Sequence, residues 1–426
     1  MRVLLTGATG FIGSRLLQAL VDCGHDVVCA VRNPPGRIAS EHVSYVRIDF
    51  VRDVQPADWV PRLHGIDVVI NAVGILQERG EQTFDVVHTR APRALFLACA
   101  QAGVKRVIQI SALGADERAT SRYHLTKKAA DDALAQLDLR WVIVQPSLVY
   151  GTEGTSAQLF TMLASLPVVP VLGAGEQLVQ PVYIDDLVAA VLTLLEPDSP
   201  ARVRVPIVGS QALPFATFLH LLRAQMQLAP TATLRAPMPL VRLAARVGSA
   251  IPGLMLDRET LSMLEQGNTG SAAAMAALIG RMPRPMTSFI PDEFATAVRR
   301  SAQLRWLLPI LRVSIALVWI VTGVVSLGVF PIEESYALLG RVGIPAGLQP
   351  VLLYGAAGLD LLLGFSLLLV RKRRWLWLLQ AGAILGYTLI ITFKLPEFWL
   401  HPYGPILKNV PLLAAIWLLY ELEKGR

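Results

Sequence analysis

The pattern of hydrophobic and polar positions divides the chain into two parts. Over about the first 300 residues, short β-branched runs alternate with segments whose apolar positions recur every three or four residues. This alternation predicts an α/β fold, a Rossmann-type doubly wound parallel sheet, with strands at 3–5, 27–31, 43–48, 68–73, 106–110 and 141–144. From 151 to 300 the pattern becomes irregular and proline-rich, which predicts a small irregular substrate lobe with helices at 217–227 and 240–247.

The remaining part of the chain is almost continuously apolar. Apolar stretches occupy 307–330, 347–370, 375–393 and 405–420. The first three reach the ~20 residues that cross a bilayer, and the fourth is shorter. We therefore expect an all-α, four-helix transmembrane domain over 305–423, behind a nucleotide-binding domain over 1–300.

Basic residues around the apolar stretches predict the orientation of the membrane domain. They precede the first stretch, join the second to the third, and follow the fourth: Arg299, Arg300, Arg305, the 371–374 cluster, Lys424 and Arg426. By the positive-inside rule, the N-terminal domain and the C-terminus face the cytoplasm. Because the chain starts directly with a strand, we expect no signal peptide. The apolar stretches and the basic residues around them predict a multi-pass protein of the cell inner (plasma) membrane.

Composition limits the partners. The chain is 53% hydrophobic and 17% charged, which is apolar for a purely soluble protein, so we expect the lipid bilayer as a partner. The net charge of +7 does not indicate nucleic acid, since the clustered basic residues flank apolar stretches. Cys23, Cys29 and Cys99 form no CxxC pair and lie in apolar surroundings. We expect buried reduced thiols and no metal site.

A glycine motif follows the first predicted strand. Glycines spaced three apart let the backbone turn tightly and approach a pyrophosphate, and the helix that follows offers free amides to the anion. Glycine triplets also occur in ordinary turns, but this one lies between strand and helix, as dinucleotide binding requires. The candidate cofactor contacts are Thr6, Gly7, Thr9, Gly10, Phe11, Ile12 and Gly13.

Residues after later strands extend the candidate cofactor site. Arg32 follows the second strand, where no acid is present, so it favours NADP over NAD unless it is an ordinary surface charge. We expect Asp49 either to accept a hydrogen bond from the adenine amino group of the cofactor or to cap a turn. The small residues after the fourth strand, Asn71, Ala72, Val73 and Gly74, leave room for a cofactor, although Gly74 is equally consistent with a plain loop.

Tyr123 and Lys127 are four residues apart and therefore lie on one face of a predicted helix. An ammonium beside a phenol stabilises phenolate and lowers a pKa that starts near 10, so the tyrosine can exchange a proton during hydride transfer. A surface pair has the same spacing. The position after the fifth strand and its Ser111 favours the chemical interpretation, in which Ser111 bonds a substrate carbonyl.

Together with ISALGA at 110–115, QPSLVYG at 145–151 and PVYIDDLVAA at 181–190, these motifs resemble those of short-chain dehydrogenases/reductases. The resemblance covers about the first 200 residues. It is to the extended or atypical branch of NAD-dependent epimerases and dehydratases, which includes the NADPH-binding accessory subunit of respiratory complex I. It implies Tyr123 as acid/base, Lys127 on the nicotinamide ribose and Ser111 as third catalytic group. Pro146, Ser147 and Leu148 would lie near the nicotinamide.

The apolar part, from about 305 to 423, resembles the DoxX-like membrane domains found behind such reductase domains. That family is associated with quinone-linked oxidation. Three functions follow from the combined pattern. The first is a membrane-tethered NADP(H)-dependent oxidoreductase acting on a carbonyl or alcohol of a small molecule, lipid-like or quinone-like. The second is a non-catalytic cofactor-binding module of a membrane complex, and the third is a nucleotide-gated transporter.

Asp360 lies in the second apolar stretch, about ten residues from the 371–374 cluster and hence ~15 Å deep. A charge at that depth costs a few kcal/mol or more, so we expect the side chain to face the bundle interior. Its candidate partners are Lys408, Asn409 and Tyr387. Interhelical hydrogen bonding and a proton or ligand role both fit this position.

Overall fold

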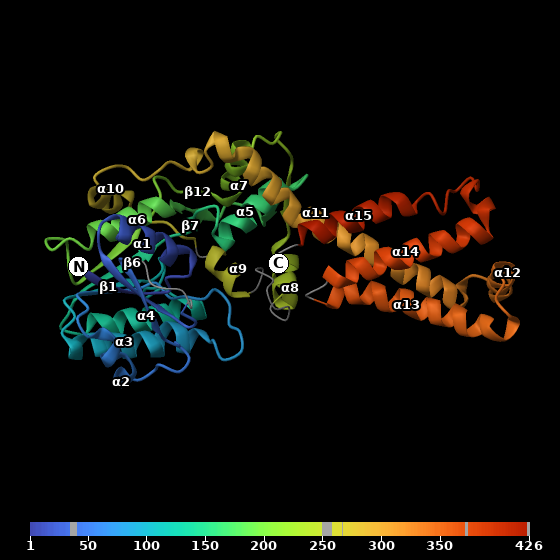
Figure 1. The fold of residues 1–426 in the computed structure, drawn as a ribbon. Helices are drawn as coiled ribbons and strands as arrows, with labels where there is room; N and C mark the ends of the chain where they lie inside the picture. The colour runs from blue at the N-terminus through green and yellow to red at the C-terminus, as the bar shows by residue number, and fades with distance from the viewer. Residues whose placement is uncertain (35–40, 249–257, 266, 371–373, 424–426) are drawn as a thin grey trace. The chain divides into compact units, whose positions relative to one another are not determined.

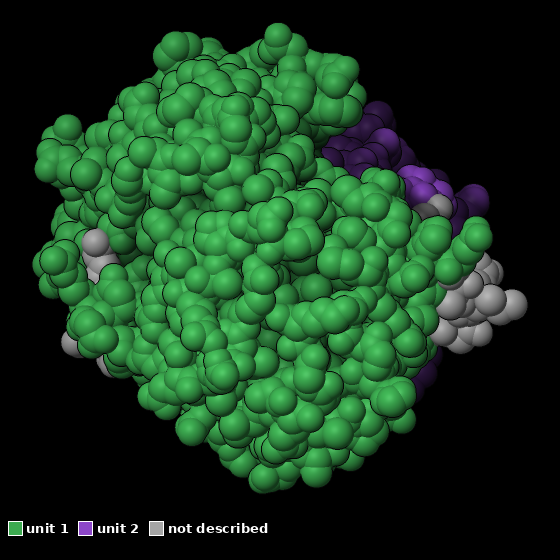
Figure 2. All heavy atoms as spheres, turned by 90° about the vertical axis from the view of Figure 1, so that its left-hand side faces the viewer, with its two compact units in different colours: residues 1–302 green, residues 303–426 purple. Residues whose placement is uncertain are grey.

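The computed structural model describes residues 1–34, 41–248, 258–265, 267–370 and 374–423. The chain forms two compact units, Met1–Ala302 and Gln303–Arg426, which are coloured separately in Figure 2. Each unit has its own hydrophobic core.

The first unit contains a seven-stranded, all-parallel sheet in the order β11-β6-β5-β4-β1-β2-β3. This is the doubly wound Rossmann arrangement, as predicted, with one additional strand, β11. The strands are β1 Arg2–Thr6, β2 Asp26–Val31, β3 Val43–Arg47, β4 Val68–Asn71, β5 Arg106–Ile110, β6 Arg140–Pro146 and β11 Val203–Ile207. The order reverses between β1 and β4, and ligands of such sheets bind outside the carboxyl ends of the strands at this switch point.

Helices cover both faces of the sheet (Figure 1). On one face lie α1 Phe11–Asp22, α6 Ile184–Thr193 and α10 Ala272–Ile279; on the other lie α2 Pro56–Trp59, α3 Ala91–Ala102 and α4 Arg122–Ala135. Within β1, Val3 and Leu5 enter the core under α1 while Leu4 enters the core over α3. Burial on both faces explains why the strands are continuously apolar.

The lobe is built from short strand pairs and helices. The pairs are β7 Val149–Tyr150 with β10 Val182–Tyr183, β8 Val169–Leu172 with β13 Thr233–Ala236, and β9 Leu178–Val179 with β12 Leu213–Pro214. Its helices include α5 Thr155–Ser165, α7 Phe215–Gln225, α8 Met238–Gly248 and α9 Arg258–Glu265. The helices predicted at 217–227 and 240–247 correspond to α7 and α8.

The second unit is helical. Its long helices are α11 Asp292–Val324, which begins in the first unit, α13 Gln349–Leu369 and α14 Arg374–Lys394; shorter ones are α12 Ile332–Val342 and α15 Asn409–Leu422. Three helices of the described residues are long and apolar enough to cross a membrane, rather than the four expected. At 14 residues, α15 extends only ~21 Å, short of the ~30 Å hydrocarbon layer. Most of the 371–374 cluster lies outside the described residues, as do Lys424 and Arg426.

Close helix packing in the second unit depends on glycine. A Cβ at Gly364 would lie 2.6 Å from a side-chain carbon of Ile320 and 3.0 Å from the Ala316 carbonyl oxygen. A Cβ at Gly323 would lie 2.8 Å from Leu361. Small residues at such positions let helices approach closely in a membrane, where van der Waals packing rather than the hydrophobic effect drives association.

Candidate functional site

The glycine motif forms the turn between β1 and α1. Gly7 has φ of +70°, and the Gly10 amide donates to the Gly7 carbonyl at 2.8 Å. A Cβ at Gly13 would lie 2.0 Å from the Gly7 carbonyl oxygen, so glycine is needed where α1 packs on the turn. No side chain caps α1 and no acidic residue lies in its first turn. The first amides of α1 are therefore available to an anion, which fits the diphosphate of a dinucleotide.

A chain of buried side chains crosses the switch point. The Thr6 hydroxyl donates to the Asn71 side-chain oxygen at 2.6 Å, and the Asn71 amide donates to the Gln109 side-chain oxygen at 2.7 Å. These bonds join the carboxyl ends of β1, β4 and β5. The strand ends are thus held together by Thr6 and Asn71, both of which were predicted as cofactor contacts. Gln109 belongs to the same chain of hydrogen bonds and was not predicted from the sequence.

The other predicted residues of the glycine motif differ in position. Thr9 and Gly10 are exposed at the turn, whereas Phe11 and Ile12 are partly buried against the core. A Cβ at Gly151 would lie 2.8 Å from the Phe11 ring. The Phe11 ring therefore packs against the QPSLVYG segment, which positions the start of α1.

The two residues expected near the adenosine differ in their surroundings. Arg32 is exposed just beyond β2, where a phosphate could meet it. Asp49 accepts from the Val51 amide at 3.0 Å and lies 3.8 Å from the Arg52 guanidinium. The Asp49 carboxylate therefore caps a turn in this structure, which is the alternative interpretation of that residue.

Lys127 points toward the carboxyl ends of β4 and β5. Its ammonium donates to the Ile110 carbonyl at 3.1 Å and to the Val73 carbonyl at 3.3 Å. A Cβ at Gly74 would lie 3.2 Å from the Lys127 Nζ, so the small residue after β4 makes room for the ammonium. Burial lowers the pKa of Lys127 to about 8, and the Asp131 carboxylate opposes this shift.

Tyr123 lies one turn before Lys127 on α4. Its ring makes edge-on contacts with Phe84, His88 and His124. Burial, reinforced by the charge of Asp131, raises the pKa of Tyr123 to about 12. The direction is opposite to the one expected from Lys127, because the desolvation of the phenol and the charge of Asp131 determine the shift.

Ser111, the predicted third catalytic group, is buried and donates its hydroxyl to Asp131. The other Asp131 oxygen is buried without a hydrogen-bond partner among the described residues. Burial raises the pKa of Asp131 to about 7, while Ser111 and Lys127 lower it. Sequence reasoning missed Asp131, although its position four residues after Lys127 places it on the same helix face.

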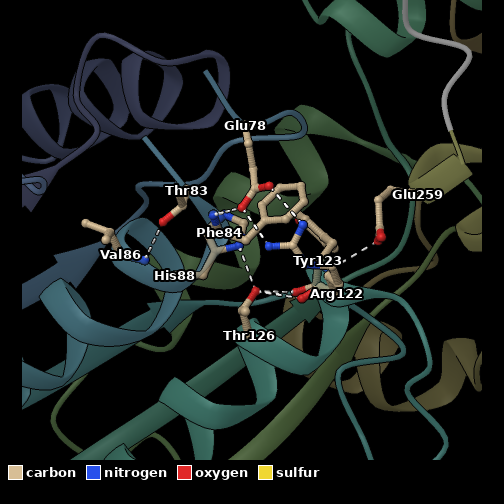
Figure 3. Close-up of polar contacts among 9 residues, drawn as sticks. All are labelled: Glu78, Thr83, Phe84, Val86, His88, Arg122, Tyr123, Thr126 and Glu259. Carbon is tan, nitrogen blue, oxygen red and sulfur yellow. Dashed lines mark hydrogen bonds and ion pairs between the residues drawn. The ribbon is translucent and has the colours of Figure 1, made fainter. Parts of the chain in front are cut away.

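His88 is a further residue beside Tyr123 (Figure 3). His88 lies in a π-helical turn, Asp85–Arg90, and its Nε2 accepts from the Ile75 amide at 3.0 Å. Burial lowers the pKa of His88 to about 2, so this ring stays neutral and fixes the loop after β4. No local sequence pattern marks His88, because the contact joins segments that only the fold brings together.

An ion pair between Arg122 and Glu78 lies beside the aromatic residues around Tyr123 (Figure 3). Arg122 contacts both Glu78 oxygens, at 2.9 and 3.0 Å, and its guanidinium lies 5.8 Å from the Phe84 ring centre. The Glu259 carboxylate of α9 lies 3.5 Å from the Tyr123 amide nitrogen. Residues from the loop after β4, from α4 and from α9 thus meet around Tyr123.

The segment after β6 is positioned by backbone contacts. Pro146 is the last residue of β6, and the buried Ser147 hydroxyl donates to the Gln180 carbonyl at 2.6 Å. Leu148 is partly buried against the core. The Ser147 side chain therefore holds two segments of the fold together.

Comparison with known families agrees with this geometry. Residues 7–165 match the family model described as NAD(P)H-binding, and residues 316–417 match the DoxX-like family. The chain joins an NAD(P)H-binding domain of the extended short-chain dehydrogenase/reductase type to a C-terminal DoxX-like domain.

Curated relatives of the NAD(P)H-binding domain have different functions. A ceramide reductase of Caulobacter vibrioides is 30% identical over 210 residues, which are 49% of this chain and 62% of that protein. Subunit 9 of the NADH dehydrogenase 1 alpha subcomplex of Arabidopsis thaliana is 30% identical over 202 residues, 45% of this chain and 49% of that protein. The chain therefore spans less than two thirds of the length of these relatives.

Solved structures show the same fold. UDP-glucuronic acid 4-epimerase from Bacillus cereus, in complex with NAD, superposes with a TM-score of 0.53 and is 18% identical. That match covers 72% of this chain and 98% of the epimerase chain. At this identity the likeness shows the fold of the NAD(P)H-binding domain alone.

The DoxX-like domain contains buried polar side chains. Asp360 is buried, and its Oδ1 has no hydrogen-bond partner among the described residues. Of its expected partners, Lys408 is exposed and Asn409 donates instead to Thr388 at 2.8 Å. Elsewhere Glu423 pairs with Arg312 and accepts from the Trp377 indole, and the Trp319 indole donates to Gln380.

Proposed function

We propose that the chain is a membrane-anchored, NADPH-dependent reductase that transfers a hydride to a carbonyl group of a small lipid-like or quinone-like molecule. The observation that carries the proposal is the pairing of Tyr123 and Lys127 on one face of α4, with the Lys127 ammonium at the carboxyl ends of β4 and β5. In the order of the sheet, β4 and β5 are the first two strands beyond the switch point, on the side away from β2. The bound nicotinamide would supply the hydride there.

The residues favour reduction over oxidation. A phenol whose pKa is raised to about 12 keeps its proton at neutral pH, so Tyr123 is suited to donate a proton to a developing alkoxide. Lys127, with a pKa of about 8, is mostly protonated at neutral pH. Its ammonium would bind the ribose hydroxyls and stabilise negative charge as the proton leaves Tyr123.

Cofactor choice rests on Arg32. It is exposed at the end of β2, and no acid occupies the position that would repel a 2′-phosphate. A planar guanidinium suits bidentate phosphate contacts, so we expect NADPH to bind more tightly than NADH.

The membrane helices and the relatives support the proposed substrate class and location. The similarity to a ceramide reductase supports a lipid carbonyl, and the DoxX-like domain would keep the site beside the bilayer. Basic residues in the N-terminal part of α11, before its apolar stretch, and others after α15 support a cytoplasmic position for both termini in the inner membrane.

Full-length protein in lipid nanodiscs tests this proposal. NADPH and NADH would be titrated by cofactor fluorescence, and oxidation of NADPH would be followed with carbonyl lipids and quinones. Tyr123→Phe should abolish turnover while NADPH binding persists, because only the proton donor is lost. Tyr45→Phe, at an exposed tyrosine of β3, is the matched control and should retain activity.

A non-catalytic cofactor-binding module is the second candidate. It is favoured by the Ser111 hydroxyl, which is engaged by Asp131 rather than free for a substrate, and by the complex I subunit among the relatives. If NADPH binds and no carbonyl substrate is turned over in a manner that depends on Tyr123, this second function replaces the first.

A further inference from the structure

Three leucines of the lobe project into solvent close together in the sequence. Leu234 of β13 is 59% exposed, and Leu240 and Leu243 of α8 are 62% and 56% exposed. Leu240 and Leu243 are three residues apart and lie on the same helix face. We call Leu234, Leu240 and Leu243 the leucine surface. Isolated exposed leucines are ordinary, but three within ten residues at such exposure indicate an interaction surface.

The leucine surface is held outward by packing on its other side. Val241 and Ala245 of α8 are buried against Leu261 of α9. The strand β13 pairs in parallel with β8 along four residues. The exposed leucines therefore cannot turn inward without unpacking α8 from α9 or β13 from β8.

Cationic side chains accompany the leucine surface. Arg235 is exposed next to Leu234, and Arg242 is exposed between Leu240 and Leu243, 3.1 Å from Glu265. Leucines mixed with arginines on a short helix are typical of segments that lie in the headgroup region of a bilayer. There the leucines enter the acyl boundary and the arginines attract anionic lipid.

One helix of the chain links the first unit to a candidate membrane span. The helix α11 is continuous from Asp292 to Val324, and Ala302 is buried in the core of the first unit. Leu307, five residues later and ~7.5 Å along the helix, is already among the exposed apolar side chains of the span. A unit joined to a membrane span by so few residues is held near a membrane surface at high effective concentration, whatever its orientation.

We propose that the leucine surface inserts into the headgroup region of the bilayer that the chain's own helices cross. The same helix pair reaches the candidate site, because α8 packs on α9 and α9 carries Glu259, whose carboxylate lies 3.5 Å from the Tyr123 amide nitrogen. Insertion of α8 places the membrane interface beside Tyr123. On the proposed function, this makes the substrate a membrane-resident lipid rather than a water-soluble carbonyl compound.

Site-directed fluorescence on the full chain in nanodiscs tests the insertion. Leu240→Cys and Leu243→Cys would be labelled with an environment-sensitive dye in a Cys23→Ser background, since Cys23 is the exposed thiol and Cys29 and Cys99 are buried. Leu97→Cys on α3 is the matched control, at a leucine 42% exposed. Dyes at the leucine surface should be blue-shifted and quenched by nitroxide lipids, and the dye on α3 should not.

Two results would overturn the insertion. One is equal lipid quenching at the leucine surface and at position 97. The other is protection from an aqueous quencher without quenching by nitroxide lipids, which would identify a protein partner instead.

A double variant separates insertion from catalysis. Leu240→Asp with Leu243→Asp should lower kcat/KM about tenfold for a bilayer-embedded lipid carbonyl, leaving kcat/KM for a water-soluble carbonyl and the Kd for NADPH unchanged. An equal loss for both substrates contradicts the assignment of a lipid substrate. The fluorescence decides the insertion even if no substrate is turned over, so the two proposals fail independently.

Discussion

The charge of Asp131 should control the pH range in which the candidate site binds NADPH. Lys127 and Asp131 lie one turn apart on α4, where side chains four residues apart have Cβ atoms ~5–6 Å from each other. At an effective dielectric constant of about 20, opposite charges at ~6 Å attract by ~3 kcal/mol, which corresponds to ~2 pH units. Asp131→Asn removes this attraction and keeps an oxygen that accepts from Ser111.

The direction follows from the pKa of Lys127. Burial depresses it to about 8 and the Asp131 carboxylate opposes that depression. The part of the NADPH affinity that depends on the ammonium is therefore complete well below pH 8 and is lost as pH rises through about 8. In Asp131→Asn the loss should occur ~2 pH units lower. Because Asp131 also raises the pKa of Tyr123, the basic limb of any pH–rate profile should move in the same direction.

The assay is an NADPH fluorescence titration on the full chain in nanodiscs. The pH of the buffers would range from ~5.5 to ~9.5, on both sides of the pKa of Lys127, which is about 8. Asp132→Asn is the matched control, since that carboxylate pairs with Lys128 and Arg204 instead. It should leave the midpoint in place. An Asp131→Asn midpoint equal to that of the unaltered chain would refute the reasoning.

Three other substitutions test separate features. Gly13→Ala should unfold the first unit more readily by ~1–3 kcal/mol and abolish NADPH binding, because its Cβ would lie 2.0 Å from the Gly7 oxygen; Gly382→Ala, with open space around it, should leave thermal unfolding unchanged. Arg32→Asp should shift preference from NADPH toward NADH in competition titrations, and unchanged preference excludes Arg32 from the site. His88→Gln should remove ~1 kcal/mol of the loss of stability between pH 6.5 and 5.5, because the imidazole binds a proton there in the unfolded chain but not in the folded one; an unchanged pH slope contradicts this.

Local pattern was sufficient for six of the seven strands of the sheet and for the longest helices. The strand predicted at 106–110 is β5, and the other five predicted strands lie within one or two residues of the observed ends. Strands buried on both faces are continuous apolar runs, which makes them easy to locate. The strand β11 was missed because its five residues, VRVPI, contain an arginine and a proline at the edge of the sheet.

In the membrane part, the length of an apolar stretch does not always equal the length of the helix that contains it. The stretches at 347–370 and 375–393 match α13 and α14, whereas α11 begins fifteen residues before the predicted 307. Hydropathy detects the part of a helix that meets lipid and not its extension into the first unit. The helix α12 was missed, since its two glutamates are as typical of a loop as of a helix. Cys23, expected to be buried, is exposed at the end of α1.

The order of the motifs along the chain was enough to establish a dinucleotide-binding sheet followed by membrane helices. Backbone turns, helix starts and apolar periodicity are local properties of consecutive residues, so they can be recognised without a structure. The state of the site could not be recognised in that way. Whether Lys127 lowers the pKa of Tyr123 depends on desolvation, on the charge of Asp131 and on the bond between Ser111 and Asp131. These quantities arise when β5, α4 and the loop after β4 come together, and folding alone creates that low-dielectric environment.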